Sequence, residues 1–447
     1  MKPFGSQCAR RPGGPGTFGF NRFVWGWAAM DNRKGLVWSA VAVWLLLLAS
    51  GVPLLGVLQA PIHGDVRLYH QVAKEVCAGQ MPYRHRHLEY PPYAVGLFLL
   101  PRACATAEPD YQQAFAALVL LADALIKYLL LTKGFEQARG LSRFLPLALY
   151  ALTVPFIRYF YLQRFDIFPA AVTLAAVIAG ARGWWGWAGA WVAVGAGLKL
   201  YPALLSPVLW VVAWRQGAGK RFAGGATLGL APLGLLSFVL PWWRFLAFHG
   251  ERGLQVESLY ASVVWLVHRL AGVPAGWVQV KAWTEVQGPL AQALVPWAKG
   301  LMLVATLSSV AFGCWVAAQV RAWNLPRLAR LALVPLVPFV ALNIVFSPQY
   351  MIWLLPSACL GMLEGRKWPM LWIALSTAVV PVWYPSPQFV TGFSLAQTLV
   401  LLGRNVGLVV VWLVLVWDWW QLARQPSAVE PGAEPLASAQ PPQPQVS

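Results

Sequence analysis

Apolar runs long enough to cross a lipid bilayer recur along the whole of this 447-residue chain. About 20 apolar residues in a helix span the ~30 Å of hydrocarbon. The first run is residues 35–59, GLVWSAVAVWLLLLASGVPLLGVLQ, and the last is residues 395–420. Hydrocarbon offers no partner to an unpaired backbone N–H or C=O, so these runs must be helical. The sequence therefore predicts an all-α, polytopic helical membrane protein.

Clusters of basic residues separate the apolar runs. They are Arg22 with Arg33 and Lys34; Lys133 with Arg139 and Arg143; Arg215 with Lys220 and Arg221; Arg321 with Arg327 and Arg330; and Arg366 with Lys367. Cytoplasmic loops collect Lys and Arg, so an even number of crossings must separate these clusters. About twelve transmembrane helices satisfy the rule and place both termini of a cell-membrane protein in the cytoplasm.

The crossings are expected at residues 36–58, 111–132, 144–162, 166–181, 187–200, 202–214, 222–242, 294–320, 330–346, 350–364, 367–385 and 395–421. Two further apolar segments, 90–105 and 259–271, are too short to count as full spans, and we expect them to be interfacial or re-entrant. The transmembrane domain is thus predicted at 36–422. A basic cytoplasmic segment precedes it at 1–35, and a Pro- and Ala-rich cytoplasmic tail follows at 423–447, both disordered by composition.

The net charge of +18 fits a membrane protein better than a nucleic-acid-binding one. Positive inner loops face anionic lipid, so membrane lipids are the expected partners and nucleic acid is not. The five cysteines contain no CxxC pair, and a disulfide between Cys77 and Cys104 stays open.

Polar residues gather in the segments that this topology places outside the cytoplasm. A charge at membrane depth costs roughly 2.5–3.5 kcal/mol, so ionisable groups near the spans indicate function. The loop after the first span holds Asp65 and Arg67, and a short loop holds Arg164 and Asp166. Further candidates are Lys199 at the outer end of a span, and His249, Arg252, Gln255 and Glu257 in the stretch 249–258.

Each candidate also has a simpler interpretation. Asp65 could form a solvated salt bridge, and Lys199 could reach lipid headgroups without any catalytic role. Together, however, the cations suit a phosphate group, while the carboxylates, amides and aromatic rings suit the hydroxyls and ring faces of a sugar. His63, His85 and His87 share no compact ligand spacing, so no metal site is predicted.

Several segments, taken in order, resemble glycosyltransferase family 87 of the GT-C superfamily. The first outer loop, 64–101, contains Asp65, Tyr69, GQMPY at 79–83 and YPPY at 90–93. The segment GLKLYPALL resembles the family's K-x-Y-P motif, and SPQYMIWLLP resembles its late S-P-Q-Y motif. The stretch HGERGLQVES is similar to a loop in bacterial relatives. The resemblance is spread over residues 63–356.

The resemblance implies a GT-C fold with a functional first outer loop. It also implies transfer of a hexose, commonly mannose, from a polyprenyl phosphate to a lipid or glycan acceptor on the extracytoplasmic face. The family's catalytic acid side chain corresponds to Asp65. The lipid-linked sugar is a co-substrate, and no cofactor is expected. No second acidic residue stands beside Asp65 in HGDVRL, a departure from many GT-C relatives that argues against a metal.

The chemistry assigns further roles. A single displacement at the anomeric carbon needs a base, for which Asp65 is the candidate, and cations at the leaving phosphate, for which the candidates are Lys199, Arg252 and Arg164. The residues expected to bind substrate are Arg67, Tyr69, Tyr83, Tyr90, Asp166, Tyr201, His249, Gln255, Glu257, Gln349 and Tyr350. Two alternatives stay open: a ligase or polymerase of lipid-linked glycans, and a transporter or flippase.

Overall fold

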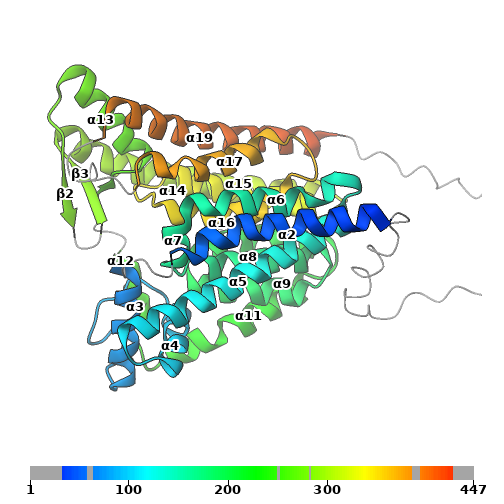
Figure 1. Ribbon diagram of the computed structural model, residues 1–447, viewed down its shortest axis with the longest axis horizontal. Helices are drawn as coiled ribbons and strands as arrows, with labels where there is room; N and C mark the ends of the chain where they lie inside the picture. The colour runs from blue at the N-terminus through cyan, green and yellow to red at the C-terminus, as the bar shows by residue number, and fades with distance from the viewer. Residues whose placement is uncertain (1–32, 58–63, 249–251, 281–282, 385–392, 426–447) are drawn as a thin grey trace, which may run out of the picture.

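The computed structural model describes residues 33–57, 64–248, 252–280, 283–384 and 393–425. The expectations about His63, His249, the segment 1–32 and the tail 426–447 lie outside these residues. The described chain is mostly helical, and its longer helices run side by side (Figure 1).

Every predicted crossing overlaps helix in the structure. The α-helices are α2 (Arg33–Leu55), α3 (Gly64–Cys77), α4 (Pro92–Cys104), α5 (Glu108–Gln137), α6 (Leu145–Thr153), α7 (Arg158–Leu162), α8 (Ile167–Ala181), α9 (Trp185–Leu198), α10 (Ser206–Arg215), α11 (Gly219–Leu236), α12 (Phe245–Phe248), α13 (Leu259–Ala271), α14 (Pro289–Gln319), α15 (Leu325–Ala341), α16 (Met351–Gly361), α17 (Trp368–Ala378) and α19 (Leu395–Arg424).

Short 3₁₀ helices extend several of these elements. They are η1 (Gly140–Phe144), η2 (Val154–Ile157), η3 (Tyr201–Leu205), η4 (Trp242–Arg244), η5 (Pro348–Tyr350) and η6 (Val380–Val382).

Among the described residues, five helical segments are long and apolar enough to cross a membrane: Val37–Leu55, Glu108–Gln137, Gly140–Leu162, Pro289–Gln319 and Leu395–Arg424. Other helices are shorter. The 11 residues of α16, for example, rise only about 16 Å. The membrane character of the chain is therefore supported, while the full set of twelve crossings stays a prediction.

Small residues allow α9 and α11 to pack closely. A Cβ added to Gly189 of α9 would collide with the backbone of Phe222 in α11, and one added to Gly225 of α11 would collide with the backbone of Gly186 in α9. Close backbone approach of this kind is typical of helix contacts in membranes, where packing replaces the hydrophobic driving force.

A small antiparallel sheet was not predicted. It consists of β1 (Leu254–Gln255), β2 (Gly276–Val280) and β3 (Trp283–Gln287) in the order β1-β3-β2. The 13-residue α13 lies between β1 and β2, starts where Ser258 Oγ accepts a hydrogen bond from the Ala261 N–H, and ends at Gly272 with φ +67°. Its 13 residues rise about 20 Å, and the expectation that 259–271 does not cross the membrane stays a prediction.

A charged pair lies inside α5, and sequence analysis did not single it out. Lys127 Nζ is 2.5 Å from Asp123 Oδ2, one helical turn away, and both side chains are buried. The Tyr161 hydroxyl donates to Asp123 Oδ1 over 2.7 Å, and Tyr150 contacts the same hydroxyl. The pair is thus neutralised within its helix and hydrogen-bonded to α7.

The two ends of the helix bundle differ. Figure 1 shows α3, α4, α12, α13 and the sheet at one end, whereas the Arg33 end of α2 and the Arg424 end of α19 lie at the other. An even number of crossings requires the N-terminal end of the first helix and the C-terminal end of the last helix to lie at the same end of the bundle. Cys77 and Cys104, both in the α3–α4 region, are free thiols. The disulfide between them that the sequence left undecided is therefore not formed.

Candidate functional site

Asp65 forms an ion pair with Arg164 at the end of the bundle that carries α3. Asp65 lies in the first turn of α3, and Arg164 lies in the turn between α7 and α8. Both side chains are mostly buried, at 13% and 22% exposed. The candidate base and one candidate phosphate ligand therefore neutralise each other in this structure.

Asp166 and Lys199 form a second ion pair. Lys199 Nζ donates to Asp166 Oδ1 over 2.6 Å, and the indole N–H of Trp353 donates to the same oxygen over 2.8 Å. Asp166 directly precedes α8, and Lys199 directly follows α9. The ammonium also lies over the ring of Trp353, 4.7 Å from its centroid. Lys199 thus has specific protein partners, which a lysine that only reaches headgroups would not need.

Glu89 and Arg252 form a third ion pair, joining the first loop to the segment just before β1. The Arg252 side chain is 10% exposed and that of Glu89 is 22% exposed. Sequence analysis nominated Arg252 but missed Glu89. The signal was present, because Glu89 is the acidic residue directly before the YPPY motif.

The three pairs surround a stack of aromatic rings. Tyr350 stacks on Trp353 at 4.0 Å between centroids, and Tyr201 stacks on Trp353 at 4.4 Å. The Tyr350 hydroxyl interacts electrostatically with Arg252, Asp166, Glu89 and Arg164. Segments distant in sequence therefore meet around Tyr350. The cluster holds three carboxylates and three cations, so its formal charge is zero.

Other predicted site residues have structural partners. The exposed Arg67 pairs with Glu108 at 2.9 Å, at the start of α5. Tyr83, with φ +65°, donates its hydroxyl hydrogen bond to the Tyr90 carbonyl over 2.7 Å. This bond holds the loop between α3 and α4.

An aromatic cluster adjoins the ion pairs. Tyr69 is fully buried and stacks on Phe98 at 4.1 Å, and Tyr90 packs edge-on against Phe98 and Phe165. Phe165 lies between Arg164 and Asp166 in sequence, so this packing fixes the turn that carries both charges. Tyr69 and Tyr90 therefore help to hold the turn that carries Arg164 and Asp166.

Gln255 and Gln349 join the late motif to β1. The Gln255 amide donates to Ser347 Oγ over 2.8 Å, and its backbone N–H donates to the Ile344 carbonyl over 2.9 Å. Gln349 is buried in η5, one residue before Tyr350. These contacts position Tyr350 within the cluster.

Glu257 belongs to a second buried cluster. Its carboxylate is 3.7 Å from Arg404 of α19, and its backbone carbonyl accepts hydrogen bonds from Arg404 at 2.8 Å and Asn405 at 3.0 Å. Burial raises the pKa of Glu257 to about 7, although Arg404 opposes the change. Tyr384 interacts electrostatically with both Glu257 and Arg164, so it links the two clusters.

Within the described ranges, no three His, Cys, Asp or Glu side chains gather in an arrangement that would hold a metal ion. The expectation of a metal-free site stays a prediction. The sequence matches no family model and no curated protein. The resemblance to glycosyltransferase family 87 therefore enters below as part of a proposal.

Proposed function

We propose that this protein is an integral membrane glycosyltransferase of the GT-C type with twelve crossings. It transfers a hexose, mannose by the family resemblance, from a polyprenyl-phosphate donor to a lipid or glycan acceptor outside the cytoplasm. The observation that carries the proposal is the cluster of three ion pairs around Tyr350. It combines carboxylates, cations and stacked rings at one end of an apolar bundle.

The cations of the cluster suit a lipid phosphate. Arg164, Lys199 and Arg252 each have a carboxylate partner, so their charge is balanced before substrate arrives. A donor phosphate that contacts Arg164 replaces Asp65 as the partner of the guanidinium. Charge-assisted hydrogen bonds to phosphate are strong and suit the planar fork of arginine.

The replacement of Asp65 by the donor phosphate at Arg164 also frees Asp65 to act as the base. Asp65 released from Arg164 accepts the proton of the acceptor hydroxyl as that oxygen bonds to the anomeric carbon. The bond from the anomeric carbon to the phosphate oxygen breaks, and its electron pair leaves with the polyprenyl phosphate. The additional negative charge is stabilised by Lys199 and Arg252. This single displacement inverts the configuration at the anomeric carbon.

The neighbouring aromatic rings suit the sugar. Tyr350, Trp353 and Tyr201 offer stacked faces beside the charged groups, and apolar ring faces pack against the C–H faces of a pyranose. In this proposal, Asp166 holds Lys199 in place and does not take the proton, because its carboxylate already accepts two hydrogen bonds.

The decisive experiment uses purified protein in liposomes with radiolabelled polyprenyl-phosphate mannose and a mixture of lipid acceptors. A transferase forms a new glycoside that is separable by chromatography and consumes the donor. Movement of intact donor between leaflets without a new glycoside would show a flippase instead. Activity only with oligosaccharides on a polyprenyl diphosphate would show a ligase or polymerase.

A further inference from the structure

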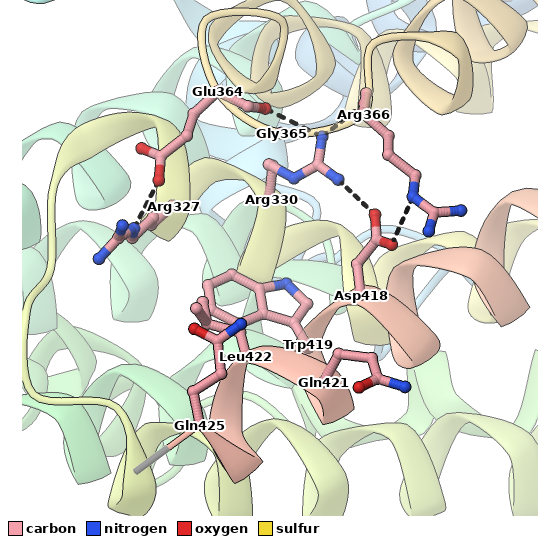
Figure 2. Close-up of a pocket in the computed structure, with 10 residues that line it drawn as sticks. All are labelled: Arg327, Arg330, Glu364, Gly365, Arg366, Asp418, Trp419, Gln421, Leu422 and Gln425. Atoms are coloured by element: carbon pink, nitrogen blue, oxygen red, sulfur yellow. Dashed lines mark hydrogen bonds and ion pairs between the residues drawn. The ribbon is translucent and has the colours of Figure 1, made fainter. Parts of the chain in front are cut away.

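A cavity of about 280 Å³ is lined by residues near the Arg424 end of α19 and is shown in Figure 2. This end of α19 lies at the end of the bundle opposite to α3, α4 and the sheet (Figure 1). Arg327 and Arg330 reach the cavity from the start of α15, Glu364 and Arg366 from the turn between α16 and α17, and Asp418 from the end of α19. Its volume is at the lower limit for ligand pockets, which are about 300–1,000 Å³.

The cavity is separate from the three ion pairs around Tyr350. Arg404 belongs to the Glu257 cluster, which Tyr384 links to the ion pairs. Asp418 of the cavity follows Arg404 by about four turns of α19, or roughly 21 Å along the helix axis. Likewise α16 begins beside Tyr350 and ends just before Glu364. The same helices therefore connect the two regions and hold them apart.

Each carboxylate in the cavity wall already has cationic or amide partners on both oxygens. Glu364 accepts from Arg327 Nε and Asn324 Nδ2, both over 2.6 Å. Asp418 is 3.0 Å from Arg330 Nη2 and 3.1 Å from Arg366 Nε. The two carboxylates thus orient the three arginines, and the group retains one net positive charge.

The central arginine is fixed by the backbone. Arg330 Nη1 donates to the carbonyls of Glu364 and Arg366 over 3.2 and 2.8 Å. Gly365 lies against its guanidinium with φ +71°, and a Cβ there would come within 3.1 Å of Arg330 Cζ. Any other residue would be strained in this conformation, so glycine and arginine fit together.

The other two arginines are more accessible. Figure 2 shows Arg327 and Arg366 on either side of Arg330, with Trp419 and Leu422 across the cavity. Arg366 is 57% exposed and Arg327 is 30% exposed. The exposed Lys367 follows Arg366 directly, which adds positive charge at the rim.

We propose that this cavity binds a phosphate group, presented either by a lipid headgroup or by a soluble phosphate compound. Arginine offers the fork geometry that phosphate oxygens accept. The retained positive charge supplies the attraction, and the Trp419 and Leu422 side chains give an apolar wall for the rest of the molecule. The site is independent of the proposed glycosyl transfer.

The test measures binding to full-length protein purified in a maltoside detergent, which contains no phosphate. One arm is equilibrium dialysis with ³²P-labelled inorganic phosphate, and the other is calorimetric titration with dioctanoyl phosphatidic acid, using dioctanoyl phosphatidylcholine for comparison. Saturable binding is expected, and one site per chain should respond to the cavity variants described below; any binding at the proposed donor site should not respond to them. Tighter binding of phosphatidic acid than of inorganic phosphate identifies a lipid source, and the reverse identifies a soluble one.

Two variants and a matched control decide whether the site is this cavity. Arg327→Gln and Arg366→Gln should each weaken the binding about tenfold, as expected for loss of a charge-assisted contact. Arg215→Gln removes an exposed cation at the end of α10, outside the cavity, and should leave the affinity unchanged. Absence of saturable binding would overturn the proposal, and so would an equal affinity in all three variants.

Discussion

Lys199 and Asp166, 33 residues apart in sequence, form a 2.6 Å ion pair whose carboxylate also accepts a hydrogen bond from Trp353. Asp166 is almost fully buried, so its charge depends on these partners. The pair joins the start of α8 to the end of α9 and holds the ammonium beside the stacked rings. Lys199 is thereby both a candidate phosphate ligand and part of the framework.

Lys199→Met should destabilise the protein by about 3 kcal/mol, because it leaves a buried carboxylate without its cation. Lys199→Met combined with Asp166→Asn removes both charges and should recover most of this loss. The measurement is thermal unfolding of each variant in the same detergent. Independent, additive effects of the two substitutions would contradict the coupling.

Asp65→Asn should lower kcat about 10²–10⁴-fold, since the amide keeps the side-chain shape but cannot accept the proton. Donor binding should not weaken, because the donor phosphate no longer has to displace a carboxylate from Arg164. The measurement is initial-rate kinetics with the labelled donor. Asp110→Asn is the matched control, because Asp110 is an exposed aspartate in the first turn of α5 and should leave kcat unchanged. Near-normal turnover by Asp65→Asn would remove this residue from the mechanism.

Arg252→Ala should raise the KM for donor about ten- to hundredfold and lower kcat less, because a charge-assisted hydrogen bond contributes roughly 1.5–3 kcal/mol. Titration of donor against the purified variant separates the two parameters. Arg215→Ala, at the other end of the bundle, is the control. An unchanged KM would show that Arg252 only stabilises Glu89 and the loop before β1.

Stability should depend on pH through Glu257. Its pKa is raised in the folded protein from an ordinary 4.5 to about 7, so the folded state binds the proton more tightly than the unfolded state. The stabilisation is complete below pH 4.5 and is lost as the pH rises through 7. The difference between the two pKa values corresponds to about 3 kcal/mol in the free energy of unfolding. Melting temperatures of the wild type should therefore fall between pH 4.5 and 7 relative to Glu257→Gln, and parallel curves would contradict this assignment.

Thiol labelling tests the predicted orientation. Gln279 lies on β2 at the site end, Lys220 lies at the start of α11, and both are exposed. With the native cysteines replaced, Gln279→Cys should react with an impermeant maleimide added to intact cells, and Lys220→Cys should react only after permeabilisation. The opposite pattern would place the ion-pair cluster in the cytoplasm and reject an extracytoplasmic transferase.

Much of the architecture could be predicted because the length of an apolar run and the placement of basic residues are local properties of the sequence. Each expected span contains helix, and Asp65, Arg164, Lys199, Arg252 and Tyr350 gather at one end. Successive loops of a helical bundle emerge at opposite ends, so every second loop lies at the same end. Motifs in those loops are therefore brought together, even where each motif alone is weak.

The pairing of charges could not be predicted in the same way. Glu89 and Arg252 are separated by 163 residues, and Asp166 and Trp353 by 187. Which cation meets which carboxylate depends on small rotations and tilts of the helices, which move side chains by a few ångströms. Glu257 and Arg404 pair for the same reason, which moved Glu257 from the expected substrate site to a contact with α19.

The Asp123–Lys127 pair has a consequence for biosynthesis. An isolated charge in a nascent span raises the cost of leaving the translocon by roughly 2.5–3.5 kcal/mol. Here both charges belong to α5, one turn apart, so the neutralising ion pair needs no residue outside that segment. Tyr161, which donates to Asp123 in the folded protein, lies 38 residues further along the chain and is synthesised later. We therefore expect the α5 segment to partition into lipid before it packs against the helices that surround it in the folded protein.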